Sequence, residues 1–176
     1  MPNAIGFARF AGIPVFLVVA FSSRGGQDAL AVTLFAVIGW ADYLDGFVAR
    51  LTGQYSRLGA LLDPIVDRLL VVSGMAVAWH FNLLPRWAIA IVIARELFML
   101  ALSRYGLRHA VEVKINWPGR VGVAPTMGAP FFAMAGVHWL ALVMLYVGMA
   151  LALIATALYV RSGVEQLRAR NESVRP

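Results

Sequence analysis

Four aspartates close together in an otherwise apolar stretch are the residues best suited to chemistry. Asp42 and Asp45 are three residues apart and Asp63 and Asp67 are four apart, so each pair shares one face of a helix. Oxygen ligands without histidine or cysteine favour a hard divalent cation. Four carboxylates could hold two such ions around a phosphate, and one carboxylate could accept a proton. The pattern therefore indicates metal-assisted phosphoryl chemistry.

The surroundings of these carboxylates are typical of a membrane protein. The chain of 176 residues is 61% hydrophobic and only 14% charged, whereas soluble domains average about 45–50% apolar and 25% charged residues. A carboxylate at the centre of a membrane helix costs about 2.5–3.5 kcal/mol. Such a cluster therefore needs a neutralising cation or a reaction that uses it. No cysteine is present, so disulfides and thiolate metal sites are excluded.

Apolar stretches of sufficient length predict an all-α integral membrane protein with six transmembrane helices. A short C-terminal surface helix or tail follows them, and residues 1–176 form a single domain. The expected spans are Ile5–Ser22, Ala29–Arg50, Leu58–Trp79, Trp87–Tyr105, Val121–Val137 and Trp139–Val160.

The basic residues predict the orientation. With the N-terminus in the cytosol, eleven Lys and Arg flank the cytosolic ends: Arg9, Arg50, Arg57, Arg104, Arg108, Lys114, Arg120, Arg161, Arg168, Arg170 and Arg175. Only Arg24 and Arg86 flank the outer ends. This bias places both termini in the cytosol of a bacterial-type inner or plasma membrane. It also accounts for the net charge of +6 without a nucleic-acid partner.

The same topology brings the two aspartate pairs to one depth. Asp45 comes about six residues before the loop between the second and third spans, and Asp63 comes about six after it, which is roughly 10 Å along each helix. The carboxylates would converge in a pocket open to the cytosol. A divalent-cation carrier is the alternative, because carboxylates inside a membrane also mark ion pathways. The outer halves of both spans are almost purely apolar, which favours a one-sided pocket over a conduit.

The stretch resembles the signature of the CDP-alcohol phosphatidyltransferases, D-x₂-D-G-x₂-A-R-x₈-G-x₃-D-x₃-D. The matching positions, with every spacing kept, are Asp42, Asp45, Gly46, Ala49, Arg50, Gly59, Asp63 and Asp67. The opening P-N-A-I-G-F-A-R and the I-A-R-E at Ile93–Glu96 are similar to the phosphatidylglycerophosphate synthase branch. The chain is accordingly identified as a member of this family.

This resemblance implies the reaction and the roles of the motif residues. CDP-diacylglycerol would be the donor, the hydroxyl of an alcohol acceptor would attack its β-phosphorus, and CMP would leave. The resemblance assigns Mg²⁺ or Mn²⁺, as two ions, to Asp42, Asp45, Asp63 and Asp67, with Asp67 also the general base. It assigns the CDP moiety to Asp42, Gly46, Arg50 and Gly59. It also implies homodimers and contacts with membrane lipid.

The acceptor depends on a second group of basic residues. Glycerol 3-phosphate is the favoured acceptor, with contacts from Arg95, Lys114 and Arg120. The branch carries a basic pair before the fifth span, where this chain has Arg120 in the first position and Gly122 in the second. Transfer to phosphatidylglycerol, as in the similar CDP-alcohol-type cardiolipin synthases, is therefore the alternative. Arg95 could instead form a structural ion pair with Glu96.

Overall fold

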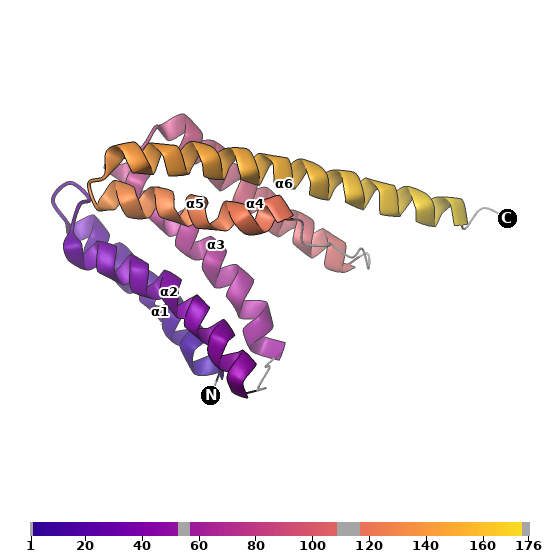
Figure 1. Cartoon of the computed structure of the whole chain (residues 1–176), viewed down its shortest axis with the longest axis horizontal. Coiled ribbons are helices and arrows are strands. Elements are labelled where there is room, and N and C mark those ends of the chain that lie inside the picture. Colours follow the sequence, from indigo (N-terminus) through magenta and orange to yellow (C-terminus); the bar gives the residue numbers. More distant parts are fainter. Residues whose placement is uncertain (1, 53–56, 109–116, 174–176) are drawn as a thin grey trace.

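The computed structural model describes residues 2–52, 57–108 and 117–173, and all regular structure in these ranges is α-helical (Figure 1). The helices are α1 (Pro2–Ser22), α2 (Ala29–Thr52), α3 (Arg57–His80), α4 (Arg86–Arg108), α5 (Trp117–Met134) and α6 (His138–Ser173). The all-helical class and the order of the helices predicted from the sequence are confirmed.

Helix α3 connects two apolar cores. One core joins α3 to α1, α2 and the end of α5, and includes Phe16, Phe35, Leu70 and Met134. The other joins α3 to α4, α5 and α6 and includes Met75 and Leu145. Figure 1 shows α3 between the α1–α2 pair and the α5–α6 pair. Side chains on different faces of α3 therefore reach different halves of the bundle, which decides where its charged residues find partners.

The connections on one side of the bundle are fixed by local capping and by glycine. Oδ1 of Asp28 accepts hydrogen bonds from the backbone N–H groups of Leu30 (2.9 Å) and Ala31 (3.1 Å), so Asp28 caps α2. Gly26 and Gly136 have positive φ angles of 74° and 80° in the α1–α2 and α5–α6 connections. Such angles strain residues with a Cβ, so these turns require glycine.

Several predicted helix ends differ from the structure by up to three residues, and those of α5 and α6 differ most. Helix α5 covers Trp117–Met134 rather than Val121–Val137, because Pro118 fits the first turn of a helix and the turn at Gly136 ends it early. Helix α6 continues without interruption to Ser173. The segment expected as a separate surface helix or tail is therefore largely a continuation of the last helix, since its residues favour helix although they are polar.

The outer surface of the bundle is rich in apolar side chains. Each of the six helices exposes large hydrophobic residues, among them Phe7, Trp40, Trp87 and Trp139. In the described part of the chain one helical stretch, His138–Gly163, is both long and apolar enough to cross a membrane. Shorter apolar helical stretches cover Gly6–Ser22, Ala29–Ala41 and Val121–Met134.

Gly148 marks a point where α5 and α6 touch through their backbones. A Cβ at Gly148 would lie 2.8 Å from the backbone nitrogen and Oγ1 of Thr126 and 3.1 Å from the carbonyl carbon of Pro125. We expect Gly148→Ala to lower the free energy of unfolding by about 1–3 kcal/mol, because the two backbones must move apart. Thermal unfolding of the purified protein in detergent measures the change.

The matched control for this variant is Gly163→Ala on the same helix, where a Cβ would meet nothing within 4 Å. Alanine favours helix over glycine by about 0.8–1.0 kcal/mol. The melting temperature of Gly163→Ala should therefore stay equal or rise. Equal losses in the two variants would show that α5 and α6 are not in close contact at Gly148.

Candidate functional site

Asp67 is the motif aspartate whose side chain the structure describes, and an arginine from α1 holds it. Its side chain is 30% exposed, and its Oδ1 accepts a hydrogen bond from Nη2 of Arg9 at 2.5 Å. Nε of Arg9 donates to the backbone carbonyl of Ile38 on α2 at 3.0 Å. A single guanidinium thus connects α1, α2 and α3 beside the aspartate motif.

The other three motif aspartates are placed by their backbones alone. Asp42 and Asp45 lie in α2 and Asp63 lies in α3, while their side chains are outside the described set. Among the side chains that are described, no group of three or more potential ligands gathers in one place. The convergence of four carboxylates stays a prediction from helix register. The donor set itself, carboxylates only, is one that suits Mg²⁺ or Mn²⁺.

The residues predicted to contact the nucleotide are likewise placed by their backbones. Gly46 and Arg50 lie in the last two turns of α2, and Gly59 lies in the first turn of α3. These two helix ends are joined by the short connection 53–56, so the three residues belong to one end of the hairpin. The side chain of Arg50 is outside the described set, and its role toward CDP stays a prediction.

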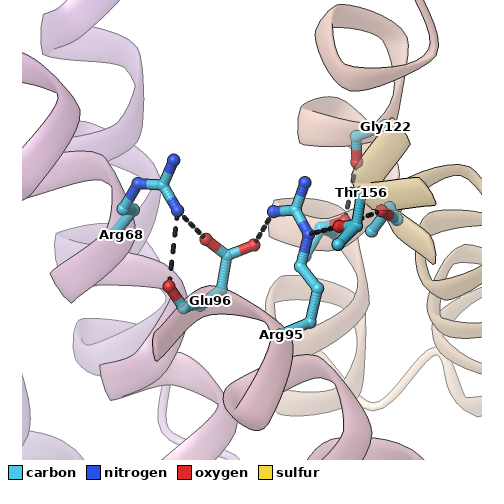
Figure 2. Close-up of polar contacts among 7 residues, drawn as sticks. Arg68, Arg95, Glu96, Gly122 and Thr156 are labelled. Atoms are coloured by element: carbon cyan, nitrogen blue, oxygen red, sulfur yellow. Dashed lines mark hydrogen bonds and ion pairs between the residues drawn. The ribbon is translucent and has the colours of Figure 1, made fainter. Parts of the chain in front are cut away.

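Arg95 takes part in a buried ion cluster (Figure 2). Glu96 of α4 is 6% exposed and lies between two guanidinium groups. Its Oε2 accepts a hydrogen bond from Nη1 of Arg68 on α3 at 2.9 Å, and its Oε1 pairs with Nη1 of Arg95. Nε of Arg95 donates to Oγ1 of Thr156 on α6 at 3.1 Å. The structural ion pair considered from the sequence is therefore present, and it extends over three helices.

The region of the other predicted acceptor contacts is described in part. Lys114 lies in the segment 109–116, which is not described, and Arg120 is placed in the first turn of α5 without its side chain. Gly122 is buried, and a Cβ there would lie 3.2 Å from Cβ of Leu151 on α6. That contact is closer than usual, so a side chain here would need Leu151 to move by a few tenths of an ångström. The position at which the resemblance predicts a second basic residue is therefore a buried glycine packed against α6.

Sequence reasoning assigned no chemical role to Arg9 or Arg68. The charge pattern places Arg9 among the residues that flank the membrane, yet its side chain is only 2% exposed. Two signals mark Arg9 in the sequence, and the first is its place at the end of the opening motif P-N-A-I-G-F-A-R. Arg9 falls on the apolar stripe of α1 that continues through Ile13, Phe16 and Ala20, all of which are buried. An arginine at a core position predicts a buried partner.

An apolar pocket of about 480 Å³ lies next to the motif. Residues of α2, α3 and α5 line it, among them Phe35, Gly39, Trp40, Leu70 and Phe131. Gly39 precedes the first motif aspartate by less than one helical turn. The arrangement places a carboxylate-bearing segment directly beside a space that suits hydrocarbon.

Comparisons with known proteins agree with the motif. A family model described as CDP-alcohol phosphatidyltransferase matches residues 1–160. Cardiolipin synthase (CMP-forming) of Streptomyces coelicolor is 34% identical over 170 residues, covering 93% of this chain and 79% of that protein. CDP-diacylglycerol–glycerol-3-phosphate 3-phosphatidyltransferase of Shigella flexneri is 31% identical over 177 residues, covering 96% and 93%. The enzyme of that name from Bacillus subtilis is 30% identical over 133 residues, covering 69% of each chain.

Proposed function

The chain belongs to the CDP-alcohol phosphatidyltransferase family, and from this we propose that it transfers a phosphatidyl group from CDP-diacylglycerol to an alcohol. The observation that carries the proposal is Asp67, a partly exposed carboxylate at the last motif position, fixed by a buried arginine. Membership in a family of transferases also removes the reason to consider a cation carrier.

The motif aspartates would supply the binding and the proton transfer. The family is generally dependent on divalent cations, and Asp42, Asp45, Asp63 and Asp67 are the residues that would hold Mg²⁺ or Mn²⁺, as two ions. A bound cation would supply charge neutralisation at the diphosphate. Asp67 would accept the proton of the acceptor hydroxyl, because the reaction requires a base beside the attacking oxygen.

The bond changes balance within this scheme. The acceptor oxygen forms a bond to the β-phosphorus of CDP-diacylglycerol, and the bond from that phosphorus to the bridging oxygen breaks. CMP leaves with the electron pair of the broken bond. The acceptor proton passes to Asp67, which releases it to water before the next turnover. Gly46, Arg50 and Gly59, with Asp42, would hold the CDP moiety at the end of the α2–α3 hairpin.

A membrane setting suits a substrate with two acyl chains. We infer six membrane-crossing helices forming one domain over residues 1–176, with both termini and the site on the cytosolic side of a bacterial inner or plasma membrane. Exposed apolar side chains on every helix support the setting. The pocket beside Gly39 and Trp40 would accommodate lipid hydrocarbon next to the motif. A homodimer is the assembly that the family resemblance implies.

The acceptor is the point at which structure and sequence favour different answers. The sequence favoured glycerol 3-phosphate, a dianion that needs several cationic contacts. Arg95 instead directs its guanidinium to Glu96 and Thr156, and Gly122 is packed under Leu151. The segment that holds Arg95 and Glu96 is itself similar to the phosphatidylglycerophosphate synthase branch, so the difference rests mainly on Gly122. A site with one basic residue fewer supports phosphatidylglycerol, whose phosphodiester carries one negative charge and whose acyl chains can remain in the bilayer. The related Streptomyces protein is named for the synthesis of cardiolipin, the corresponding product, and the Shigella and Bacillus relatives are named for transfer to glycerol 3-phosphate.

A side-by-side acceptor assay tests both the reaction and the acceptor. Purified protein with CDP-diacylglycerol and Mg²⁺ is given phosphatidylglycerol, glycerol 3-phosphate, inositol phosphate or serine. We expect the rate of CMP release with phosphatidylglycerol to exceed that with glycerol 3-phosphate by at least about tenfold. This ratio corresponds to a difference of about 1.4 kcal/mol in transition-state stabilisation. Mass spectrometry should identify cardiolipin as the product.

The remaining outcomes of this assay distinguish the two parts of the proposal. Equal or faster formation of phosphatidylglycerophosphate from glycerol 3-phosphate would reverse the choice of acceptor and leave the reaction intact. Absence of CMP with every acceptor, in samples that remain folded, would reject the reaction. Excess chelator serves as the control, and it should stop CMP release with any acceptor.

A further inference from the structure

Arg9 is a charged residue at a core position. Residues 9, 13, 16 and 20 form one stripe of α1, and the other three members, Ile13, Phe16 and Ala20, belong to the apolar core shared with α2 and α3. The side chain of Arg9 is 2% exposed. A guanidinium in such a place is kept only where its N–H groups are satisfied.

The contacts of Arg9 connect two parts of the aspartate motif. Nη2 contacts Oδ1 of Asp67 on α3 at 2.5 Å, and Nε donates to the carbonyl of Ile38 on α2 at 3.0 Å. In a regular α-helix the carbonyl of Ile38 also accepts the backbone N–H of Asp42. Arg9 thus fixes Asp67 relative to the helical turn of α2 that leads to the first motif aspartate.

The two members of the ion pair differ in exposure, as expected if the buried arginine orients the exposed carboxylate. Arg9 is sealed inside the bundle, whereas the Asp67 side chain is 30% exposed. Arg68, the neighbour of Asp67 in sequence, directs its guanidinium to Glu96 of α4 instead. The Arg9–Asp67 pair therefore joins α1 to α3 across the packing interface, while Arg68 serves a different carboxylate.

Stability alone does not explain the pair. Apolar residues of similar volume commonly replace a buried ion pair without loss of stability. Helix α1 is already anchored by apolar side chains, with Phe16 fully buried and its ring centroid 5.3 Å from that of Phe35 on α2. A charged residue that the packing does not require, placed against the exposed carboxylate of the motif, indicates a role in the reaction.

We propose that Arg9 is a positioning residue that holds the Asp67 carboxylate in the orientation needed to accept the acceptor proton. The proposal rests on the proposed function, because it acts through Asp67 as base. Arg9 contacts Asp67 and the α2 backbone at once, and the planar guanidinium, with several donors in fixed directions, can do so. Loss of this support would leave the carboxylate in place but misaligned.

The first test separates turnover from binding. Arg9→Gln should lower kcat about 100-fold with a small change in KM for CDP-diacylglycerol, because a misplacement of about 1 Å has an effect of that size. Arg9→Lys keeps the charge but cannot contact Asp67 and Ile38 at once. Its kcat should therefore be about tenfold higher than that of Arg9→Gln. Phe16→Leu, on the same buried stripe, is the control, and it should lower the melting temperature while kcat per folded molecule is unchanged.

The second test asks whether Arg9 acts through Asp67. In an Asp67→Asn background, adding Arg9→Gln should change the residual kcat by less than about threefold, since residues that act as a unit are not additive. Binding of Mn²⁺ without lipid substrate, followed by electron paramagnetic resonance, provides a readout independent of turnover. Arg9→Gln should weaken it about tenfold if the orientation of Asp67 is lost, and Phe16→Leu should not.

The proposal fails if Arg9→Gln has the kcat and Mn²⁺ affinity of Phe16→Leu. It also fails if the effects of Arg9→Gln and Asp67→Asn on kcat multiply. Either result would leave the proposed function standing, because the wild-type protein would still release CMP. A wild-type protein that releases no CMP would instead reject the proposed function itself, and Mn²⁺ binding would then be the remaining test of the Arg9–Asp67 pair.

Discussion

Asp67→Asn is expected to lower CMP formation about 1,000-fold, within the 10²–10⁴ range typical of a lost general acid or base. The amide keeps the size of the side chain and an oxygen that can accept the hydrogen bond from Arg9. It cannot take the acceptor proton, and it binds a divalent cation more weakly than a carboxylate does. Initial rates of CMP release at saturating CDP-diacylglycerol measure the loss.

The same chemical change at Asp28 provides the control. Asp28 caps α2 on the other side of the bundle, and asparagine is an equally good capping residue. Asp28→Asn should therefore retain wild-type turnover and melting temperature. If Asp67→Asn also retained turnover, Asp67 would be neither the base nor a required ligand, and the base would have to be sought among the other motif aspartates.

Much of the fold could be predicted from hydropathy, because each apolar stretch of sufficient length corresponds to one helix. The helix ends were less predictable. Helix α6 runs to Ser173 because helix formation continues beyond Arg161, where apolar character stops. Helix α5 ends at Met134 because of the glycine turn that follows. Hydropathy records where a chain is apolar and not where its backbone hydrogen bonds end.

Some residues of the candidate site could be predicted from the sequence and others could not. The motif aspartates were recognisable because their spacing is local, within two helices joined by a short connection. The partner of Asp67 was not, because Arg9 is 58 residues away in sequence and reaches it only through the packing of α1 on α3. The available signs are the helical spacing of Arg9 from Ile13 and Phe16 and its place at the end of the opening motif.

Glu96 illustrates the opposite case, in which a local pattern had two interpretations. From the sequence, Arg95 and Glu96 could be an acceptor contact or an ion pair. Adjacent residues on a helix point in different directions, so the sequence did not decide between the two interpretations. The third member, Arg68, makes the ion pair part of a larger cluster, in which the carboxylate lies between two guanidinium groups and has both oxygens occupied.

Glu96→Ala is expected to be the most destabilising of the substitutions considered. It would leave Arg68 and Arg95, with side chains 24% and 14% exposed, facing one another without the carboxylate between them. Breaking a buried pair costs about 3–5 kcal/mol. For a chain of this length that corresponds to a fall of roughly 6–20 °C in melting temperature. Thermal unfolding in detergent measures it, and a wild-type melting temperature would show that the arginines have other counter-ions.

Replacing all three members of the ion cluster together distinguishes its effect on stability from any effect on acceptor binding. The triple variant Arg68→Met, Arg95→Met, Glu96→Leu removes both the charges and their counter-ion, so most of the lost stability should return. Its kinetics then test the acceptor role of Arg95. Turnover of phosphatidylglycerol with an unchanged KM would make the cluster a structural connection among α3, α4 and α6. A higher KM for the acceptor alone, with the KM for CDP-diacylglycerol unchanged, would mean that Arg95 contacts the acceptor while Glu96 holds it in place.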